Sequence, residues 1–179
     1  MSFEPSLFNT SLISAKVQET LPEGYVLRPL KRSDFANGHL DVLRDLAYLG
    51  EITEKMWTER FDWMLKCNGT YYVAVIEDPS RDGGKIVATG TLMVEKKFLY
   101  KLGTQGHIED VAVIGDQQGK KLGVKLLHAL DHIAEQVGCY KTILDCSEEN
   151  EGFYVKCGYE KAGSEMHHYY DHEAEEHGV

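Results

Sequence analysis

GHIEDVAV at residues 106–113, followed after a short linker by QGKKLGV at residues 118–124, is the stretch that decides the fold. We expect a strand over residues 107–114 and a long amphipathic helix from Gly119 through Val137. A strand that ends in a glycine-containing turn and opens a helix presents free backbone N–H groups and the positive end of the helix dipole. This arrangement is typical of a seat for a pyrophosphate and favours a diphosphate-bearing cofactor.

A purely structural role for the two glycines is the alternative to a cofactor loop. Gly119 could simply ease the turn, and Gly123 could let helix and sheet approach closely. Two other phosphate-binding motifs fail on spacing. A Walker loop needs four residues before its Gly-Lys and then Ser or Thr, but Gly115 leaves three and Lys121 follows. The turn also lacks GxGxxG spacing and comes too late in the chain for a Rossmann fingerprint.

The rest of the chain alternates between strand and helix patterns around this stretch. Strands are expected at residues 25–30, 70–76, 86–95, 140–146 and 159–169, and helices at 33–50, 53–68 and 150–156. The turn cluster at 78–84 predicts an antiparallel pair. Trp57 and Phe61 are expected in the core. This order predicts a mixed α/β sheet in which the long helix crosses between two parallel central strands.

Composition limits the classes of function. The chain has 179 residues, the size of one domain, with 19 Lys and Arg against 29 Asp and Glu and a net charge of −10. An acidic protein repels phosphate backbones, so nucleic-acid and anionic-membrane binding are disfavoured. The sequence has no membrane-length apolar run, no secretory signal pattern and no CxxC pair among its four cysteines. We expect reduced thiols and a cytoplasmic location.

Domain organisation and metal binding can also be judged from the sequence. We expect a flexible N-terminal arm at residues 1–20, one domain at 21–170 and an acidic tail at 171–179 that frays. His128 and His132 lie one helical turn apart, but Ala129 stands where a zinc protease carries glutamate. The apolar face of the same helix turns both histidines toward solvent, so no metal site is expected.

Residues 118–123 resemble the Q/R-x-x-G-x-G/A acetyl-CoA loop of the GNAT superfamily of N-acetyltransferases, with Lys121 where the superfamily prefers glycine. The segments at 106–110, 139–146 and 150–159 resemble those of the eukaryotic glucosamine-6-phosphate N-acetyltransferases. The resemblance covers about residues 21–168. The resemblance implies the GNAT acyl-CoA N-acyltransferase fold, a mixed central sheet with splayed parallel strands and flanking helices. It also implies a homodimer with shared active sites.

The reaction that this resemblance implies is acetyl transfer from acetyl-CoA to the 2-amino group of glucosamine 6-phosphate, on the way to UDP-N-acetylglucosamine. Tyr154 stands at the position of the family tyrosine that faces the cofactor sulfur, and its phenol is suited to act as general acid. Glu109 and Asp110 are implied to bind the sugar and to accept the ammonium proton, and Asp145 to orient the amine. Consecutive residues of a regular strand point to opposite faces, so only a bulge or the strand's end lets Glu109 and Asp110 serve one site.

The binding residues follow from the same resemblance. Those implied to bind acetyl-CoA are Val111, Ala112, Val113, Gln118, Gly119, Lys120, Lys121, Leu122, Gly123, Val124, Asn150 and Tyr154. Those implied to bind the sugar phosphate are Lys97, Tyr100, Glu109, Asp110, Val111, Asp145, Cys146, His168 and Tyr169.

Two of these positions depart from the family pattern. Tyr100 and Tyr169 stand where basic residues are usual, and His167 and His168 are candidates to replace them. Cys146 is expected to be a buried structural thiol rather than a nucleophile. An N-acetyltransferase for another small amine, and a CoA-binding protein without turnover, are the alternative functions.

Overall fold

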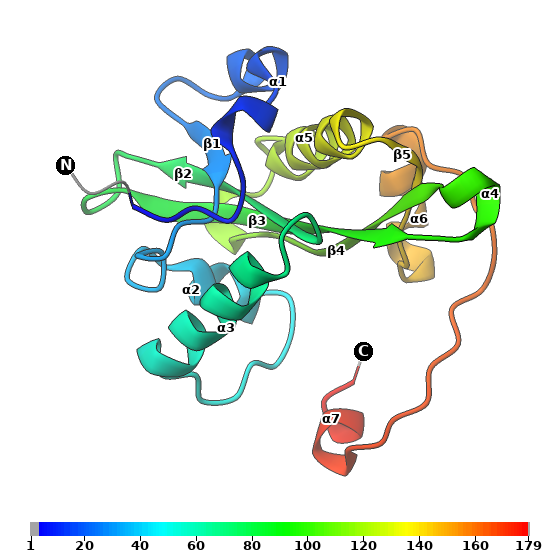
Figure 1. Ribbon diagram of the computed structural model, residues 1–179. Coiled ribbons are helices and arrows are strands. Elements are labelled where there is room, and N and C mark those ends of the chain that lie inside the picture. Colours follow the sequence, from blue (N-terminus) through cyan, green and yellow to red (C-terminus); the bar gives the residue numbers. More distant parts are fainter. Residues whose placement is uncertain (1–3, 179) are drawn as a thin grey trace. The chain divides into compact units, whose positions relative to one another are not determined.

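The structure is a computed structural model that describes residues 4–178 and separates into two compact units, Met1–Leu144 and Asp145–Val179 (Figure 1). This boundary falls inside the domain predicted for residues 21–170. Residues 1–3 of the predicted arm and residue 179 of the predicted tail lie outside the described residues. Within the described part of the chain, no helix is long and apolar enough to cross a membrane.

The first unit is built on a five-stranded sheet with the order β1-β2-β3-β4-β5. The first four strands are antiparallel to their neighbours, and β5 runs parallel to β4. The mixed sheet and the antiparallel hairpin across residues 78–84 confirm the sequence prediction. The strands are β1 Val26–Pro29, β2 Tyr71–Asp78, β3 Lys85–Lys96, β4 Thr104–Val113 and β5 Cys139–Ile143.

Helices cover both faces of this sheet. Figure 1 shows α5 (Leu122–Gln136) and α1 (Ala15–Thr20) on one face, and α2 (His39–Arg44) and α3 (Glu54–Lys66) on the other. The apolar stripe of α5 is fully buried, as its periodicity predicts; its core side chains are Leu126, Leu127, Leu130, Ile133 and Ala134. Trp57 and Phe61 are buried on α3, which confirms their assignment to the core. The remaining short helices of this unit are η1 Thr10–Leu12, α4 Leu99–Leu102 and η2 Gly115–Gln117.

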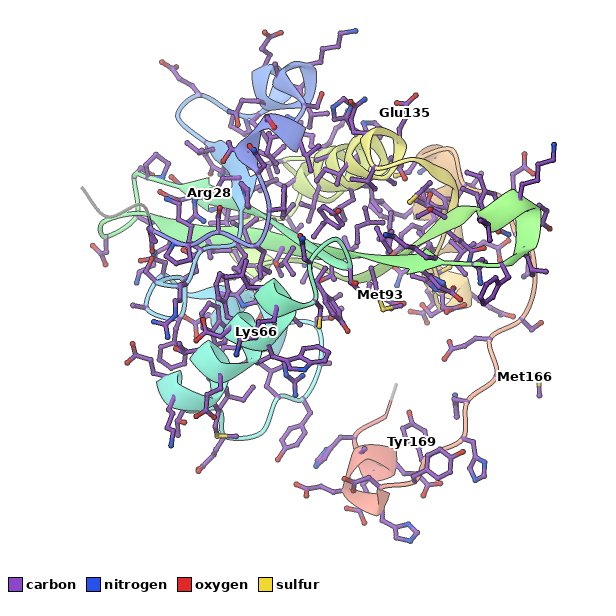
Figure 2. All side chains as sticks on the ribbon, viewed as in Figure 1. Arg28, Lys66, Met93, Glu135, Met166 and Tyr169 are labelled. Atoms are coloured by element: carbon purple, nitrogen blue, oxygen red, sulfur yellow. The ribbon has the colours of Figure 1, made fainter. Side chains whose placement is uncertain are left out.

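A buried ion pair shortens the helix that was expected over residues 33–50. Asp34 is 0% exposed, and its carboxylate accepts hydrogen bonds from Arg28 Nη1 at 2.7 Å and Nη2 at 2.9 Å. It also accepts one from the backbone N–H of Lys31 at 2.7 Å. Although burial acts to raise it, hydrogen bonding to Arg28 holds the pKa of Asp34 below its ordinary value. The carboxylate therefore gathers residues 31–37 into turns, and α2 begins only at His39. Arg28 lies on β1 (Figure 2). Its guanidinium also contacts Glu77 of β2.

The described part of the N-terminal segment packs on the sheet, whereas its sequence favours a loosely held arm. Leu7 and Phe8 are each 8% exposed, and the Leu7 N–H donates to the Leu30 carbonyl. Gln18 of α1 donates to the Tyr25 carbonyl and accepts from the Leu27 N–H. These contacts hold the segment from residue 7 to α1, and no apolar periodicity in the sequence signals them.

The second unit contains α6 (Glu148–Lys156) and α7 (His172–Glu176). The strand expected over residues 159–169 does not form, and that prediction is wrong for the single chain. A strand exists only where its backbone pairs with a neighbour, and these residues make no ladder with any described strand. Met166 and Tyr169 lie along this extended segment (Figure 2). Asp171 caps α7 by accepting from the Glu173 N–H, where the sequence favours a fraying tail.

Candidate active site

A β-bulge in β4 organises the candidate site. Thr89 pairs with Ala112 and Thr91 pairs with Glu109, so Gly90 of β3 lies opposite two residues, Asp110 and Val111. Asp110 takes up the extra length by adopting a left-handed φ of 52°. This is the bulge that sequence reasoning required if both acids were to serve one site.

The bulge places the two consecutive acids on the same face of the sheet. Glu109 lies opposite Thr91, and directly opposite residues share a face. Thr91 and Asp110 both line a cavity of about 270 Å³ between the sheet and the helices α2 and α3. Glu109 and Asp110 therefore face the same side, which a regular strand would not allow.

The surroundings of Asp110 are largely apolar. Water reaches its surface, but Leu40, Leu43, Trp57 and other apolar side chains line the same cavity. Desolvation raises the pKa of Asp110 above its ordinary value. A carboxylate whose ionised form is disfavoured in this way is a stronger proton acceptor than a solvated aspartate.

The pairing between the parallel strands β4 and β5 ends before the bulge. Their register runs from Thr104 opposite Cys139 to His107 opposite Ile143, and there the pairing ends. In the described chain, β4 continues to Val113 without a partner on that side. The free edge has unpaired backbone groups that an extended amide-containing ligand could pair with, at Val111, Ala112 and Val113. The pairing ends because β5 stops at Ile143, so the splay of the two strands stays a prediction.

The loop between β4 and α5 contains two residues with left-handed backbone conformation, both within the segment QGKK at residues 118–121. Gly119 has a φ of 85° and Lys121, the N-cap of α5, has a φ of 59°. Lys121 offers no side-chain cap, so the first N–H groups of the 15-residue helix remain available to an anion. Gly119, Lys120 and Lys121 are exposed, whereas Leu122 is buried under the loop and Gly123 and Val124 are half-buried.

Sequence reasoning missed the anchor that holds this loop. Lys120 Nζ donates to the Tyr25 hydroxyl at 2.8 Å and to Gln117 Oε1 at 2.6 Å, and the Tyr25 hydroxyl donates to the same Gln117 oxygen. Gln117 is only 6% exposed. The Lys120 ammonium is therefore already hydrogen-bonded within the protein. The Lys121 ammonium, in contrast, contacts no acceptor among residues 4–178. No periodic or spaced motif links Tyr25 to residues 117–120, so only the fold could reveal this contact.

Comparison with known proteins agrees with this geometry. The Acetyltransferase (GNAT) family profile matches residues 39–159. The chain belongs to the GNAT family. It is 46% identical to the glucosamine 6-phosphate N-acetyltransferase of Candida albicans over 82% of this chain and 96% of that protein. The crystal structure of the glucosamine-6-phosphate N-acetyltransferase from Arabidopsis thaliana superposes with a TM-score of 0.79 at 40% identity, covering 83% of this chain and all of that one. Acetyltransferases of the GNAT family use acetyl-CoA.

The second unit of this GNAT chain carries the expected tyrosine. The Tyr154 ring on α6 packs against two other rings, with centroid separations of 5.1 Å to Phe153 and 6.3 Å to Tyr159. Burial, and to a lesser degree the thiols of Cys146 and Cys157, raise the pKa of Tyr154 above its ordinary value. The phenol therefore stays protonated throughout the neutral range. Asn150, in the first turn of the helix, donates to the Ser147 hydroxyl at 3.1 Å.

Two residues of the second unit differ from their sequence predictions. β5 ends at Ile143 rather than at residue 146, so Asp145 and Cys146 lie in the loop before α6. Cys146 is exposed, and its assignment as a buried structural thiol is wrong because the strand that would have buried it stops short. All four cysteines are free thiols.

The residues predicted to bind phosphate are spread over both units. Lys97 Nζ pairs with Glu95 Oε2 at 2.7 Å, and His107 Nε2 lies 3.2 Å from the same oxygen. Tyr100 is 70% exposed and has a left-handed φ of 52°. Its ring packs against that of Tyr140, with the ring centroids 4.8 Å apart. In the second unit the Tyr169 ring contacts the His167 ring at 5.0 Å, and His168 stacks on Tyr170. Among residues 4–178 no group of three or more His, Cys, Asp or Glu could hold a metal ion.

Replacing Lys121 by glycine should stabilise the fold. A non-glycine residue in the left-handed conformation destabilises the folded state by about 1 to 2 kcal/mol, and glycine removes this strain. Glycine also increases the conformational entropy of the unfolded chain, which offsets about 0.4 to 1 kcal/mol of the gain. We expect Lys121→Gly to raise the free energy of unfolding by about 0.5 to 1 kcal/mol in urea titrations. Lys120→Gly is the matched control. Lys120 is not left-handed, and its replacement removes two hydrogen bonds, so this variant should be less stable than the wild type. A loss of stability in Lys121→Gly would contradict the strain at this position.

Replacing Asp110 by asparagine should change how stability depends on pH. A group whose pKa is raised by folding contributes stability that is present below its unfolded pKa and is lost as pH rises through its folded pKa. Asp110→Asn should therefore melt at the same temperature as the wild type in acid and a few degrees higher near neutrality, by differential scanning calorimetry. Asp82→Asn, an exposed carboxylate in the β2–β3 turn, should show no such gap. Parallel curves for Asp110→Asn and the wild type would refute the desolvation of Asp110.

Proposed function

We propose that this protein transfers the acetyl group of acetyl-CoA to the 2-amino group of glucosamine 6-phosphate, and so supplies UDP-N-acetylglucosamine synthesis. The observation that carries the proposal is the bulge that turns Glu109 and Asp110 to one face, in a chain 46% identical to an enzyme named for this reaction. Carboxylates at the acceptor site suit a substrate whose amine arrives as an ammonium ion.

The cofactor is proposed to lie along the free edge of β4 and across the start of α5. Backbone groups of Val111, Ala112 and Val113 would pair with the amides of the pantetheine arm, and one N–H would polarise the thioester carbonyl. The pyrophosphate would rest on the N–H groups of residues 119–124, where the helix dipole favours negative charge. The exposed Lys121 ammonium adds a positive charge at this place. Asn150 of α6 is proposed to contact the cofactor as well.

The reaction is proposed as direct attack of the amine on the thioester carbonyl. The N–C bond forms, the C–S bond breaks, and CoA leaves as a thiolate. Asp110, directly or through water, takes the proton that the ammonium must lose, while Glu109 and Asp145 hold the amino sugar. Tyr154 donates a hydrogen bond to the departing sulfur and supplies its proton, and the second proton that the nitrogen loses as the amide forms restores the phenol. Its raised pKa supports a donor that remains protonated, and the bond is strongest when negative charge develops on sulfur.

The phosphate end of the substrate is proposed to meet Lys97, Tyr100, His168 and Tyr169. We also propose that Cys146 contacts the sugar, that the protein is cytoplasmic, and that it is a homodimer whose active sites are shared. In support of a shared site, residues 160–169 form no strand in the described chain, and Met166 and Tyr170 are each 93% exposed. Pairing with a second copy would satisfy this backbone.

A second candidate acceptor is a small amine without a phosphate. Two observations favour it: Lys97 is already paired with Glu95, and tyrosines stand at two positions where basic residues are usual. A phosphate site without a guanidinium lacks the bidentate clamp that makes such contacts strong.

The acceptor can be decided by measuring thiol release from acetyl-CoA with a panel of amines. We expect kcat/KM for glucosamine 6-phosphate to exceed that for glucosamine by about 100-fold, which corresponds to one or two charge-assisted hydrogen bonds to the phosphate. Equal values for the two sugars would remove the phosphate from the assignment and favour the second candidate. Binding of CoA in calorimetry, without turnover of any amine, would indicate a binding protein.

Replacing Tyr154 by phenylalanine should slow transfer without weakening cofactor binding. Loss of a positioned proton donor typically costs about 10² to 10⁴ in rate. We expect Tyr154→Phe to lower kcat within this range, while the Kd for CoA changes less than about threefold because the ring and its packing remain. Tyr170→Phe removes a hydroxyl from a fully exposed ring of the same unit and should leave kcat unchanged. An unchanged kcat in Tyr154→Phe would exclude the role of the phenol.

A further inference from the structure

A chain of three polar side chains crosses the apolar layer between α2, α3 and the sheet. Trp57 Nε1 donates to His39 Nδ1 at 3.2 Å, and His39 Nε2 lies 3.2 Å from Thr89 Oγ1. All three are buried, with 7%, 7% and 1% of their surface exposed, and all three line the cavity that also holds Asp110. Trp57 was expected in the core, whereas no motif or spacing in the sequence points to His39 or Thr89.

The hydrogen bonds of this chain have one possible direction. An indole N–H can only donate, so His39 Nδ1 must accept. A neutral imidazole that accepts at Nδ1 carries its proton on Nε2, and this N–H donates to the Thr89 hydroxyl. Burial lowers the pKa of His39 to about 4, against the opposing charge of Asp34, so the ring stays neutral throughout the neutral range. Each of the three groups thus fixes the orientation of the next.

The chain ends at the residue of β3 that borders the bulge. Thr89 pairs with Ala112, and the next position along β3 is Gly90, which lies opposite Asp110 and Val111. On the other face of the sheet α5 presses on Gly90: a Cβ there would lie 3.0 Å from Leu130 and 3.1 Å from Leu126. The bulge is therefore held from both faces, by close packing on one and by the hydrogen-bonded chain on the other.

We propose that the Trp57–His39–Thr89 chain is a positioning device that holds the β4 bulge and thereby aims Asp110 at the acceptor amine. The inference rests on the proposed function, because it assigns these residues to that same site. A buried polar chain is no more stabilising than apolar side chains of the same shape, and a partly broken one is worse. Its directional bonds do fix a geometry, which apolar packing fixes less strictly. None of the three is a catalytic residue: each acts through Asp110.

The decisive variant is Thr89→Val, which removes the hydroxyl and keeps the shape of the side chain. Thr91→Val is the matched control: it makes the same change on the same strand and in the same cavity, on the far side of the bulge, and its hydroxyl is not part of the chain. We expect Thr89→Val to lower kcat about tenfold or more, with KM for acetyl-CoA within twofold. Thr91→Val should keep the wild-type kcat, and Thr89→Ser should restore it by returning the hydroxyl.

A second readout does not depend on acetyl transfer. The titration of the Asp110 carboxyl can be followed by carbon NMR, assigned with Asp110→Asn, in the full chain. The charged groups of the other elements around this cavity are Arg60 of α3 and Asp34, which acts on His39. We expect the Asp110 titration to shift in Thr89→Val and in Trp57→Phe but not in Thr91→Val. Trp57→Phe gives this answer even if Thr89→Val does not fold, because it removes the donor that orients His39.

These outcomes separate the two proposals. If the wild type acetylates no amine, the proposed function fails, and the NMR titrations still decide whether the chain positions Asp110. If transfer occurs but Thr89→Val and Thr91→Val share the same kcat and the same Asp110 titration, and differ only in thermal stability, the chain is merely structural and the inference is overturned.

Discussion

The extra residue in β4, where Asp110 and Val111 lie opposite Gly90, is the constraint on which the rest of the site depends. It turns two consecutive acids to one face and places Asp110 among apolar side chains. β5 ends opposite His107, before the bulge, and after the bulge β4 leads into the loop before α5. A regular strand would alternate the acids between faces. One register shift therefore places two consecutive acids on one acceptor surface.

Left-handed non-glycine residues occur in the β3–β4 connection, at Tyr100, Lys101 and Leu102, and at two positions of the proposed site. Asp110 and Lys121 are left-handed without being glycine, and so is Tyr100 in the β3–β4 connection. Such residues persist only where the surrounding structure over-determines them. At Asp110 that support comes from Gly90 beneath α5 and from the hydrogen-bonded chain to Thr89. At Lys121 the conformation leaves the first N–H groups of α5 uncapped, which suits an anionic ligand. At Tyr100 the side chain stays exposed and contacts the ring of Tyr140.

Electrostatics in this acidic chain depends on local environment more than on net charge. Asp34 is deeply buried, yet Arg28 keeps its pKa below the ordinary value. Asp110 is reached by water and forms no ion pair with a cation among residues 4–178, and desolvation raises its pKa. The first carboxylate is structural because it is fully paired, and the second is suited to accept a proton because it is not. Composition alone assigns the same charge to both.

The sequence by itself determined the order of the elements, the hairpin, the buried stripe of α5, the glycine turn before it and the family, because each of these depends on local periodicity, turn residues or short motifs. Only the tertiary structure decided the bulge, the early end of β5, the anchor from Tyr25 to Gln117 and the chain from Trp57 to Thr89. These features join residues far apart in the chain, and register is set by packing across strands rather than by neighbours along them. The strand expected at 159–169 does not form for the same reason: a strand needs a neighbouring strand with which its backbone can pair.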